Sequence, residues 1–362
     1  MFESRRSALR GLLRAAEVEV DALLVTDLVN IRYLTGFTGS NAALLVHVGG
    51  DAASRFCTDG RYRAHAAAQV PELETVIDRA SAMALAGSAG GWQVGRLGFE
   101  SDAVTVDAHA AMADAAGAVE LHRMPGLVQR LRAVKDDAEI AVLLAACAAA
   151  DAALADLLAA GGLRPGRTER EVALDLEIRM REHGATGPAF ETIVAAGAHS
   201  AVPHHSPTGA ELRTGDLVKM DFGALVDGYH SDMTRTVVLG PAAAWQRELH
   251  ELVAAAQAAG RAALRPGTAV SDVDGAARRV VEQAGRGAEF VHGLGHGVGL
   301  QIHEAPALAR TGTGALAAGM VVTVEPGVYL EGQGGVRIED TLVVRDGEPS
   351  LLTRTTRELV EV

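Results

Sequence analysis

Acidic side chains lie inside short apolar stretches in the second half of the sequence. Asp221 lies in the stretch 217–222, Asp232 lies at the start of 232–238, and Asp227-Gly228 between them is a turn signal. The pattern predicts a β-hairpin whose two carboxylates face each other from adjacent strands. Opposed carboxylates repel each other and are costly to bury without a partner, so a bound cation is expected between them.

A second pair of acids repeats this arrangement later in the chain. The stretch 215–221 matches 319–325 at an offset of 104 residues, which aligns Asp221 with Glu325, and Glu339 follows in the place of Asp232. Ahead of each copy, the tetrapeptide Leu-Arg-Pro-Gly precedes a predicted helix. Two copies of a helix followed by a strand pair indicate a pseudo-symmetric domain, in which each half contributes two acids to a common centre.

A histidine flanked by glycines supplies a fifth candidate ligand. Gly295 and Gly297 leave the His296 imidazole unshielded and let the backbone approach a site closely. Four carboxylates and one neutral imidazole can hold two divalent ions, and this oxygen-rich set favours Mn²⁺, or Co²⁺ or Zn²⁺ by availability. Two ions about 3.5–4 Å apart can share a bridging water and lower its pKa. The residues therefore predict a hydrolase with a dinuclear metal site.

The elements that must position these residues fall into two domains. The first third of the chain alternates strand and helix signals, with apolar runs at 22–26 and 42–48. Pro125 follows the last of these signals, and 126–160 has the periodicity of one continuous helix. We therefore expect an N-terminal α/β domain over residues 1–125 and a second domain, with α+β architecture, over residues 126–362.

The composition excludes several other classes of function. The 362 residues carry a net charge of −13, which disfavours a nucleic-acid partner. Lys135 and Lys219 are the only lysines among 33 basic residues, a bias that we attribute to coding composition. Two widely spaced cysteines exclude a disulfide framework and a thiolate zinc site. Aspartates interrupt the apolar stretch 141–160, so we expect a buried helix, no membrane partner and a cytoplasmic protein.

The motifs around the acids resemble those of the pita-bread metallopeptidases, which include Xaa-Pro dipeptidase (prolidase), aminopeptidase P and methionine aminopeptidase. The resemblance covers essentially the whole chain. The matching motifs are Ser200-Ala201-Val202-Pro203-His204, Met220-Asp221-Phe222-Gly223, Ser231-Asp232-Met233-Thr234-Arg235-Thr236, Gly295-His296-Gly297-Val298-Gly299-Leu300, Ile302-His303-Glu304, Val324-Glu325-Pro326-Gly327 and Arg337-Ile338-Glu339-Asp340. Stretches 33–37 and 57–62 resemble the N-terminal domain of the proline-specific branch, which methionine aminopeptidase lacks.

The resemblance implies a fold, a ligand set and a mechanism. The fold is a creatinase/prolidase-like α/β N-terminal domain followed by a pseudo-two-fold, α+β pita-bread catalytic domain. The implied metal ligands are Asp221, Asp232, His296, Glu325 and Glu339. A bridging hydroxide would attack the scissile carbonyl, and Glu325 would pass a proton to the leaving nitrogen. His204 and His303 would hold the substrate or the tetrahedral intermediate.

Two further residues are candidates for contact with the substrate. The resemblance places Arg337 near the site, although we expect its side chain to point away from Glu339 unless the strand bends. Tyr229 lies beside the predicted hairpin, where it can either contact substrate or pack against the strands.

The expected reaction is hydrolysis of the peptide bond that precedes proline. The compact chain favours an Xaa-Pro dipeptidase acting on a proline-containing dipeptide. The alternatives are an Xaa-Pro aminopeptidase (aminopeptidase P) acting on longer peptides, and a non-catalytic pita-bread protein that binds peptides. Relatives of that last class lose metal ligands, whereas this chain keeps all five. The resemblance also implies a homodimer.

Overall fold

The computed structural model describes residues 1–362 and divides into two compact units. The N-terminal unit is Met1–Arg132 and the C-terminal unit is Ala133–Val362. The division falls at the end of α6 (Leu127–Ala133). It therefore lies a few residues C-terminal to residue 125, where we expected the boundary.

The prediction of one continuous helix over 126–160 is wrong. The chain leaves the helical path after α6 and starts again as α7 (Asp137–Ala159). Asp136 caps α7, because its carboxylate accepts from the amide of Glu139 at 2.9 Å while the Glu139 side chain accepts from the amide of Asp136 at 3.0 Å. This reciprocal cap starts a new helix where hydrophobic periodicity alone indicates an uninterrupted one.

The N-terminal unit is an α/β layer structure, as predicted. Its six strands are β1 (Ala22–Val25), β2 (Ala42–His47), β3 (Arg55–Thr58), β4 (Glu74–Ile77), β5 (Arg96–Phe99) and β6 (Glu120–Arg123). They form one sheet in the order β4-β3-β2-β1-β5-β6, in which β2 is antiparallel to both neighbours and the other pairs are parallel.

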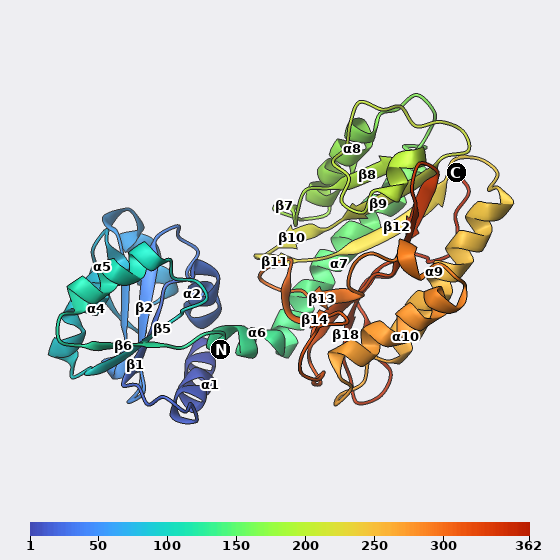
Figure 1. Cartoon of the computed structure of the whole chain (residues 1–362). Coiled ribbons are helices and arrows are strands. Elements are labelled where there is room, and N and C mark those ends of the chain that lie inside the picture. The colour runs from blue at the N-terminus through green and yellow to red at the C-terminus, as the bar shows by residue number, and fades with distance from the viewer. The chain divides into compact units, whose positions relative to one another are not determined.

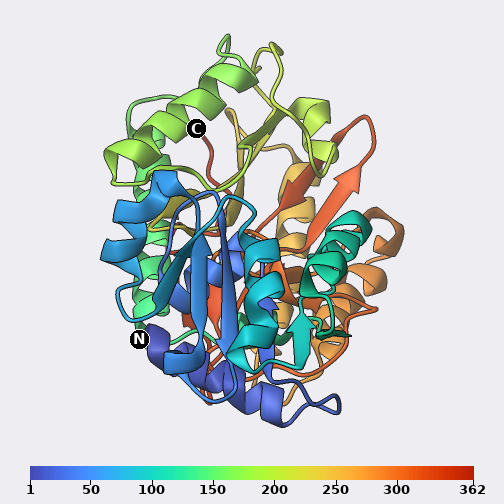
Figure 2. The same ribbon diagram turned by 90° about the vertical axis from the view of Figure 1, so that its left-hand side faces the viewer.

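Helices cover both faces of this sheet. The helices are α1 (Phe2–Arg14), α2 (Leu28–Thr35), α3 (Arg63–Gln69), α4 (Ser81–Ser88) and α5 (Val106–Ala116). In Figure 1, α4 and α5 lie on one face and α1 and α2 on the other, and Figure 2 shows the same strands from the side. Alternate residues of the strands, including Leu24 and Leu45, are buried against α4 and α5. Because helices also cover the other face, the intervening residues are apolar too, and the strands appear in the sequence as continuous apolar runs.

The C-terminal unit consists of two similar halves, which confirms the predicted pseudo-two-fold architecture. The first half contains α7, α8 (Glu169–Glu182), β7 (Gly187–Pro188), β8 (Ile193–Ala196), β9 (Leu217–Phe222), β10 (Ala224–Val226), β11 (Tyr229–His230) and β12 (Met233–Val238). The second half contains α9 (Ala244–Ala262), α10 (Val270–Gln283), β13 (Gly295–Gly297), β14 (Glu304–Leu308), β15 (Val321–Val324), β16 (Gly327–Leu330), β17 (Gly334–Arg337), β18 (Asp340–Val343) and β19 (Ser350–Leu351).

Each half packs a pair of helices on its own strands. The first half contains the sheets β12-β9-β8 and β11-β10-β7, and the second half contains the sheet β14-β13-β15-β18-β19 and the strand pair β16-β17. Each half has its own apolar core, with Leu157 and Met220 in the first and Val253 and Val324 in the second. In Figure 1, α8 of the green and yellow first half and α9 and α10 of the second half lie at the periphery of the unit, whereas α7 runs through its middle in this view.

Helix α7 is long and apolar enough, by length and composition alone, to cross a membrane. A helix in the core of a folded domain passes the same test. In the structure, Leu143, Leu154 and Leu157 of α7 are buried, and two of them belong to the core that α7 shares with α8. The side-chain packing therefore agrees with the buried alanine-rich helix that we expected.

A buried arginine fastens the two halves together. The Arg235 guanidinium on β12 lies 2.8 Å from a carboxylate oxygen of Asp340 on β18 and donates to the carbonyl oxygens of Thr355 and Thr356 at 2.7 and 2.8 Å. Both side chains of the ion pair are at most 4% exposed. Next to it, the Glu339 amide donates to the Thr234 carbonyl at 3.1 Å. The segment that carries Glu339 is therefore held against the strand that follows Asp232.

We expect Arg235→Met to destabilise the C-terminal unit by about 3 kcal/mol, because it leaves Asp340 buried without its main cation. The control is Arg247→Met, whose ion pair with Glu361 is 50% and 40% exposed and should contribute less than about 1 kcal/mol. Urea unfolding followed by Trp245 fluorescence, in a Trp92→Phe background, measures both. Equal effects of the two variants would show that Arg235 does not join the halves.

Candidate metal centre and active site

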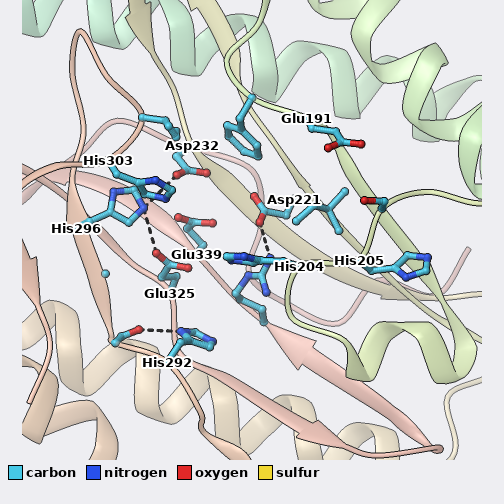
Figure 3. A pocket seen from close by; sticks show the side chains of 17 residues that line it. Glu191, His204, His205, Asp221, Asp232, His292, His296, His303, Glu325 and Glu339 are labelled. Carbon is cyan, nitrogen blue, oxygen red and sulfur yellow. Dashed lines mark hydrogen bonds and ion pairs between the residues drawn. The ribbon is translucent and has the colours of Figure 1, made fainter. Parts of the chain in front are cut away.

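The C-terminal unit contains a cavity of about 400 Å³ whose lining includes five acids and five histidines. Figure 3 shows Asp221, Asp232, Glu325 and Glu339 gathered with His296 around one point. The lining residues that the sequence analysis singled out are His204, Asp221, Asp232, His296, His303, Glu325, Arg337 and Glu339. The structure thus brings together eight of the nine predicted site residues, and Tyr229 does not line the cavity.

The first pair of acids lies on the predicted hairpin, but the two are not directly opposed. In the β9–β12 register Asp221 pairs with Thr234, and Asp232 immediately precedes β12. The two carboxylates therefore share a face of the sheet and lie diagonally across the strand pair. The turn at Asp227-Gly228 is present, with both residues at positive φ. Gly223 separates β9 from β10, and a Cβ there would fall 1.8 Å from the Ser231 carbonyl oxygen.

The second pair of acids stands next to each other at the ends of two paired strands. Glu325 follows β15 and Glu339 precedes β18, whose adjacent residues Val324 and Asp340 are paired. A Glu339 carboxylate oxygen accepts from the Thr234 hydroxyl at 2.7 Å, and Thr234 belongs to the first half. This hydrogen bond crosses the pseudo-two-fold and brings the two pairs of acids into one cluster.

His296 joins the acid cluster from β13. Its Nε2 atom lies 3.3 Å from a carboxylate oxygen of Glu325 and 3.5 Å from one of Asp232. Its Nδ1 atom lies 3.0 Å from the Gly297 carbonyl oxygen. Because a carbonyl can only accept, we assign a proton to Nδ1, so Nε2 is the nitrogen that donates to Glu325 without metal and that can bind a metal ion once it loses its proton. This is the orientation that a metal-binding imidazole needs.

The acid cluster has the properties of a cation site. One carboxylate oxygen of Asp221 and one of Glu339 are buried without any hydrogen-bond donor. Burial, and after it the charges of the neighbouring acids, raise the pKa of Asp232 and of Glu339 well above their ordinary values. Asp232, His296 and Glu339 also offer three donor atoms within 4.8 Å of one another. Hard oxygen donors and one imidazole fit divalent ions such as Mn²⁺, which would satisfy the orphaned oxygens.

Arg337 is tied to the acids rather than turned away from them, so our expectation for its side chain is wrong. Residues two apart on a strand share a face, and Arg337 and Glu339 both contact Thr234. The guanidinium also forms an ion pair with Asp221 and donates to the Tyr329 hydroxyl at 2.8 Å. These contacts leave Arg337 only 1% exposed, so at the wall of the cavity its guanidinium is engaged in orienting Asp221.

The two predicted substrate histidines lie at the cavity surface. His303 packs edge-on against His296, with ring centroids 4.4 Å apart. His204 lies near Asp221, across the acid cluster from His303 (Figure 3). Both side chains are exposed, which is the state expected of groups that contact a bound molecule. Tyr229, by contrast, is 8% exposed and donates to a Glu139 carboxylate oxygen at 2.9 Å, which corresponds to packing rather than substrate contact.

Sequence reasoning missed a buried acid that organises the loop before His204. Glu169, at the start of α8, accepts from the Ala196 amide, from the amide and hydroxyl of Thr208, and from the rings of His199 and His205, all within 3.0 Å. Burial opposes ionisation, but these donors lower the pKa of Glu169 to about 2. No local signal could have identified it, because its partners come from distant positions.

Two more missed residues surround the cavity. His292 lines it and contacts the Tyr329 hydroxyl at 2.8 Å, so Tyr329 links His292 to Arg337. The Gly-rich motif at 293–299 drew attention to His296 alone. His292 precedes that motif directly, and this proximity was the available signal.

Comparisons with known proteins match both units. Residues 141–346 match the profile of Metallopeptidase family M24, and residues 5–134 match the Creatinase/Prolidase N-terminal domain. An uncharacterized peptidase of Bacillus subtilis, YqhT, is 38% identical over 95% of this chain and 96% of its own. The solved structure of Xaa-Pro dipeptidase from Bacillus anthracis covers 100% of both chains, with a TM-score of 0.94 and 36% identity. The X-Pro aminopeptidase from Thermotoga maritima covers 95% of this chain and 98% of its own, with a TM-score of 0.87 and 31% identity.

We expect Asp232→Asn to stabilise the metal-free protein at neutral pH by about 1 kcal/mol or more, because it removes a buried, repelled charge. The raised pKa of Asp232 means that the metal-free folded state binds this proton more tightly than the unfolded state, where the ordinary value is 3.8. Wild-type stability therefore falls as pH rises above that value, and the advantage of Asn grows over the same range.

Urea unfolding of metal-free wild type and Asp232→Asn at pH 5, 6 and 7 measures this difference. Added Mn²⁺ should raise the melting temperature of the wild type and not that of the variant. A variant that is less stable than wild type at pH 7 without metal would contradict the repulsion that we assign to the acid cluster.

Proposed function

Because the chain belongs to Metallopeptidase family M24, we propose that it is an Xaa-Pro dipeptidase, which hydrolyses the peptide bond before proline. The observation that carries this proposal is the convergence of four carboxylates and His296 from both halves on one cavity. The similarity in fold and sequence to the Xaa-Pro dipeptidase of Bacillus anthracis over the full chain supports the choice of substrate. The match of residues 5–134 to the Creatinase/Prolidase N-terminal domain also supports this choice, because that domain is named after the prolidases.

We propose that Asp221, Asp232, His296, Glu325 and Glu339 hold two divalent ions, with Mn²⁺ as the native metal. The orphaned oxygens of Asp221 and Glu339 and the oxygen-rich donor set support this assignment. When bound, such ions would supply Lewis acidity, which lowers the pKa of water and polarises a carbonyl group. The same donor set also accepts Co²⁺ or Zn²⁺.

Glu325 is the residue that we propose to carry the proton. Burial opposes its ionisation, but the hydrogen bond and charge of His296, and then the charge of Arg337, lower the pKa of Glu325 to about 2. The carboxylate is therefore ionised at neutral pH and can accept a proton from the attacking water. The proline nitrogen leaves as a secondary amine and needs a proton as the bond breaks, so Glu325 would deliver the proton there.

His204 and His303 would bind the substrate from two sides of the acid cluster. Each exposes an imidazole to the cavity, so a ring N–H can donate to the carbonyl oxygen that becomes negative during attack, or to the carboxylate of proline. Arg337 would act through Asp221, whose carboxylate it holds in place. In this proposal His204 and His303 contact the substrate, whereas Arg337 orients a metal ligand.

We further propose a cytoplasmic homodimer. Both cysteines, Cys57 and Cys147, are buried free thiols, which fits a reducing compartment. The dimer is supported by the family resemblance alone, and light scattering at working concentration measures it.

Hydrolysis assays with metal-stripped protein test the proposed function directly. We expect an Xaa-Pro dipeptide to be cleaved only after Mn²⁺ is added, and an Xaa-Pro-Xaa tripeptide to be left intact. Asp232→Asn should lose the activity, by about 100-fold or more, because it removes a ligand.

Two outcomes would redirect this conclusion. Cleavage of the tripeptide would make the chain an Xaa-Pro aminopeptidase, which the similarity to the Thermotoga maritima enzyme already makes the second candidate. Failure to cleave either peptide, with Mn²⁺ bound, would refute the specificity for proline.

A further inference from the structure

The chain uses lysine at only two of its 33 basic positions, and both lysines are buried in the C-terminal unit. The Lys219 residue is 0% exposed, and the Lys135 side chain is 1% exposed. Lysine is almost never fully buried unless its nitrogen has partners, so each burial must have a local reason. In both cases, a group that accepts a hydrogen bond from the lysine nitrogen lies within two residues of His204 or His303 in the sequence.

Lys219 fastens the chain segment that leads into His204. Its Nζ atom donates to the carbonyl oxygens of Val202 and Pro203, at 2.5 and 3.2 Å. It also lies 5.1 Å from the centre of the Tyr329 ring. The two peptide groups directly before His204 are therefore held by a side chain of β9, the strand that also carries Asp221, and the Pro203 carbonyl accepts a further hydrogen bond from Arg337 at 3.1 Å.

Lys135 fastens the turn that carries His303. Its Nζ atom lies 3.1 Å from one carboxylate oxygen of Glu304, and the other oxygen of Glu304 accepts from the Gln301 amide at 3.0 Å. Glu304 thus closes the short turn 301–304 around His303. The Lys135 amide donates to the Gly319 carbonyl at 2.9 Å, so the lysine is itself anchored just before β15.

A compact amine fits these two places better than the guanidinium used elsewhere in the chain. At Gly299, a Cβ would lie 3.0 Å from the Lys135 side chain and 2.9 Å from the Glu304 carboxylate, so the ion pair has no spare room. At Lys219, one nitrogen serves two consecutive carbonyls and a ring face, which suits a single tetrahedral centre and not a planar fork.

We propose that Lys219 and Lys135 are positioning residues for the two cavity histidines, Lys219 for His204 and Lys135, through Glu304, for His303. The proposal rests on the proposed function, because it assumes that both imidazoles contact the substrate. The two anchors reach the loops from opposite sides of the acid cluster and set where each imidazole stands relative to the metal ligands. Displacement by about 1 Å of a group that must meet the substrate can cost about 100-fold in rate.

Crossed double-mutant cycles on kcat/KM for an Xaa-Pro dipeptide test this pairing. Lys219→Met should lower kcat/KM by about 10- to 100-fold in the wild type and in His303→Ala, but by less than about 2-fold in His204→Ala. Lys135→Met should likewise lower kcat/KM in the wild type and in His204→Ala, but by less than about 2-fold in His303→Ala. Equal losses in both histidine backgrounds would overturn the proposal, because a general structural role gives no such pairing.

A matched control is Arg167→Met. Arg167 also donates to backbone carbonyls, those of Gly162 and Glu171, but it lies outside the cavity lining. We expect kcat/KM to change by less than about 2-fold in this variant. A loss as large as that of the lysine variants would show that removal of any basic side chain bonded to backbone carbonyls impairs the unit.

A readout without turnover separates this proposal from the proposed function. In metal-free protein with ¹³C-labelled histidine, Lys219→Met should shift the ring signal of His204 and not that of His303, and Lys135→Met the converse, with assignment from the alanine variants. The affinity for Mn²⁺, measured by calorimetry, should stay within about 3-fold of wild type, because the five ligands are intact.

The outcomes of these measurements are distinct. Selective ring shifts in a protein that cleaves no Xaa-Pro peptide would refute the proposed function and keep the positioning roles. Loss of Mn²⁺ binding in Lys219→Met and in the milder Lys219→Gln, which keeps one donor, would overturn the role of Lys219. The same loss in Lys135→Met and Glu304→Gln would overturn that of Lys135.

Discussion

The structure of the C-terminal unit depends on the burial of four carboxylates at one point. Ionised carboxylates that lie next to one another repel, and burial removes the water that would screen their charges. Asp232 and Glu339 show the consequence, since burial and neighbouring acids hold their pKa values well above normal. The surrounding fold supplies only part of the compensation, through Arg337 on Asp221, Thr234 on Glu339 and His296 on Glu325. The remaining charge has to be met by cations.

The pseudo-two-fold arrangement is the means by which this burial is achieved. Each half carries its two acids at the ends of strands that its own apolar core makes rigid. The acids meet only because the segment before β18 lies against β12, where Arg235 and Asp340 join the halves. Around this centre, the loops of His204 and His303 are fastened by buried polar contacts.

The sequence predicted the two-domain order, the duplicated strand pairs and the residues that gather in the cavity. These features are local or repeat in register, so period, turn residues and spacing reveal them. It did not predict that α6 and α7 are separate helices, because the Asp136 cap competes with a continuing apolar pattern. It left Tyr229 open between packing and substrate contact, and it gave the wrong direction for Arg337, although alternation along a strand was sufficient to orient the latter.

The contacts of Glu169, Lys219 and Tyr329 lay beyond sequence reasoning for a different reason. Each joins segments far apart in the chain, and nothing in the spacing of one segment identifies the other. The position of Lys219 was visible in the sequence as a rarity, but its meaning depended on which carbonyl groups the fold would bring to it.

The contribution of acids from both halves to one cluster ties the folding of the unit to ion supply. Neither half contains all five proposed ligands. An ion bound at the centre would therefore stabilise the unit with its two halves packed together, and not either half alone. By mass action, the fraction of docked molecules then follows the free concentration of that ion. Chains made during metal starvation would spend more time with the halves apart and be exposed to proteolysis. The abundance of such a protein, and not only its turnover rate, would report the metal status of its cell.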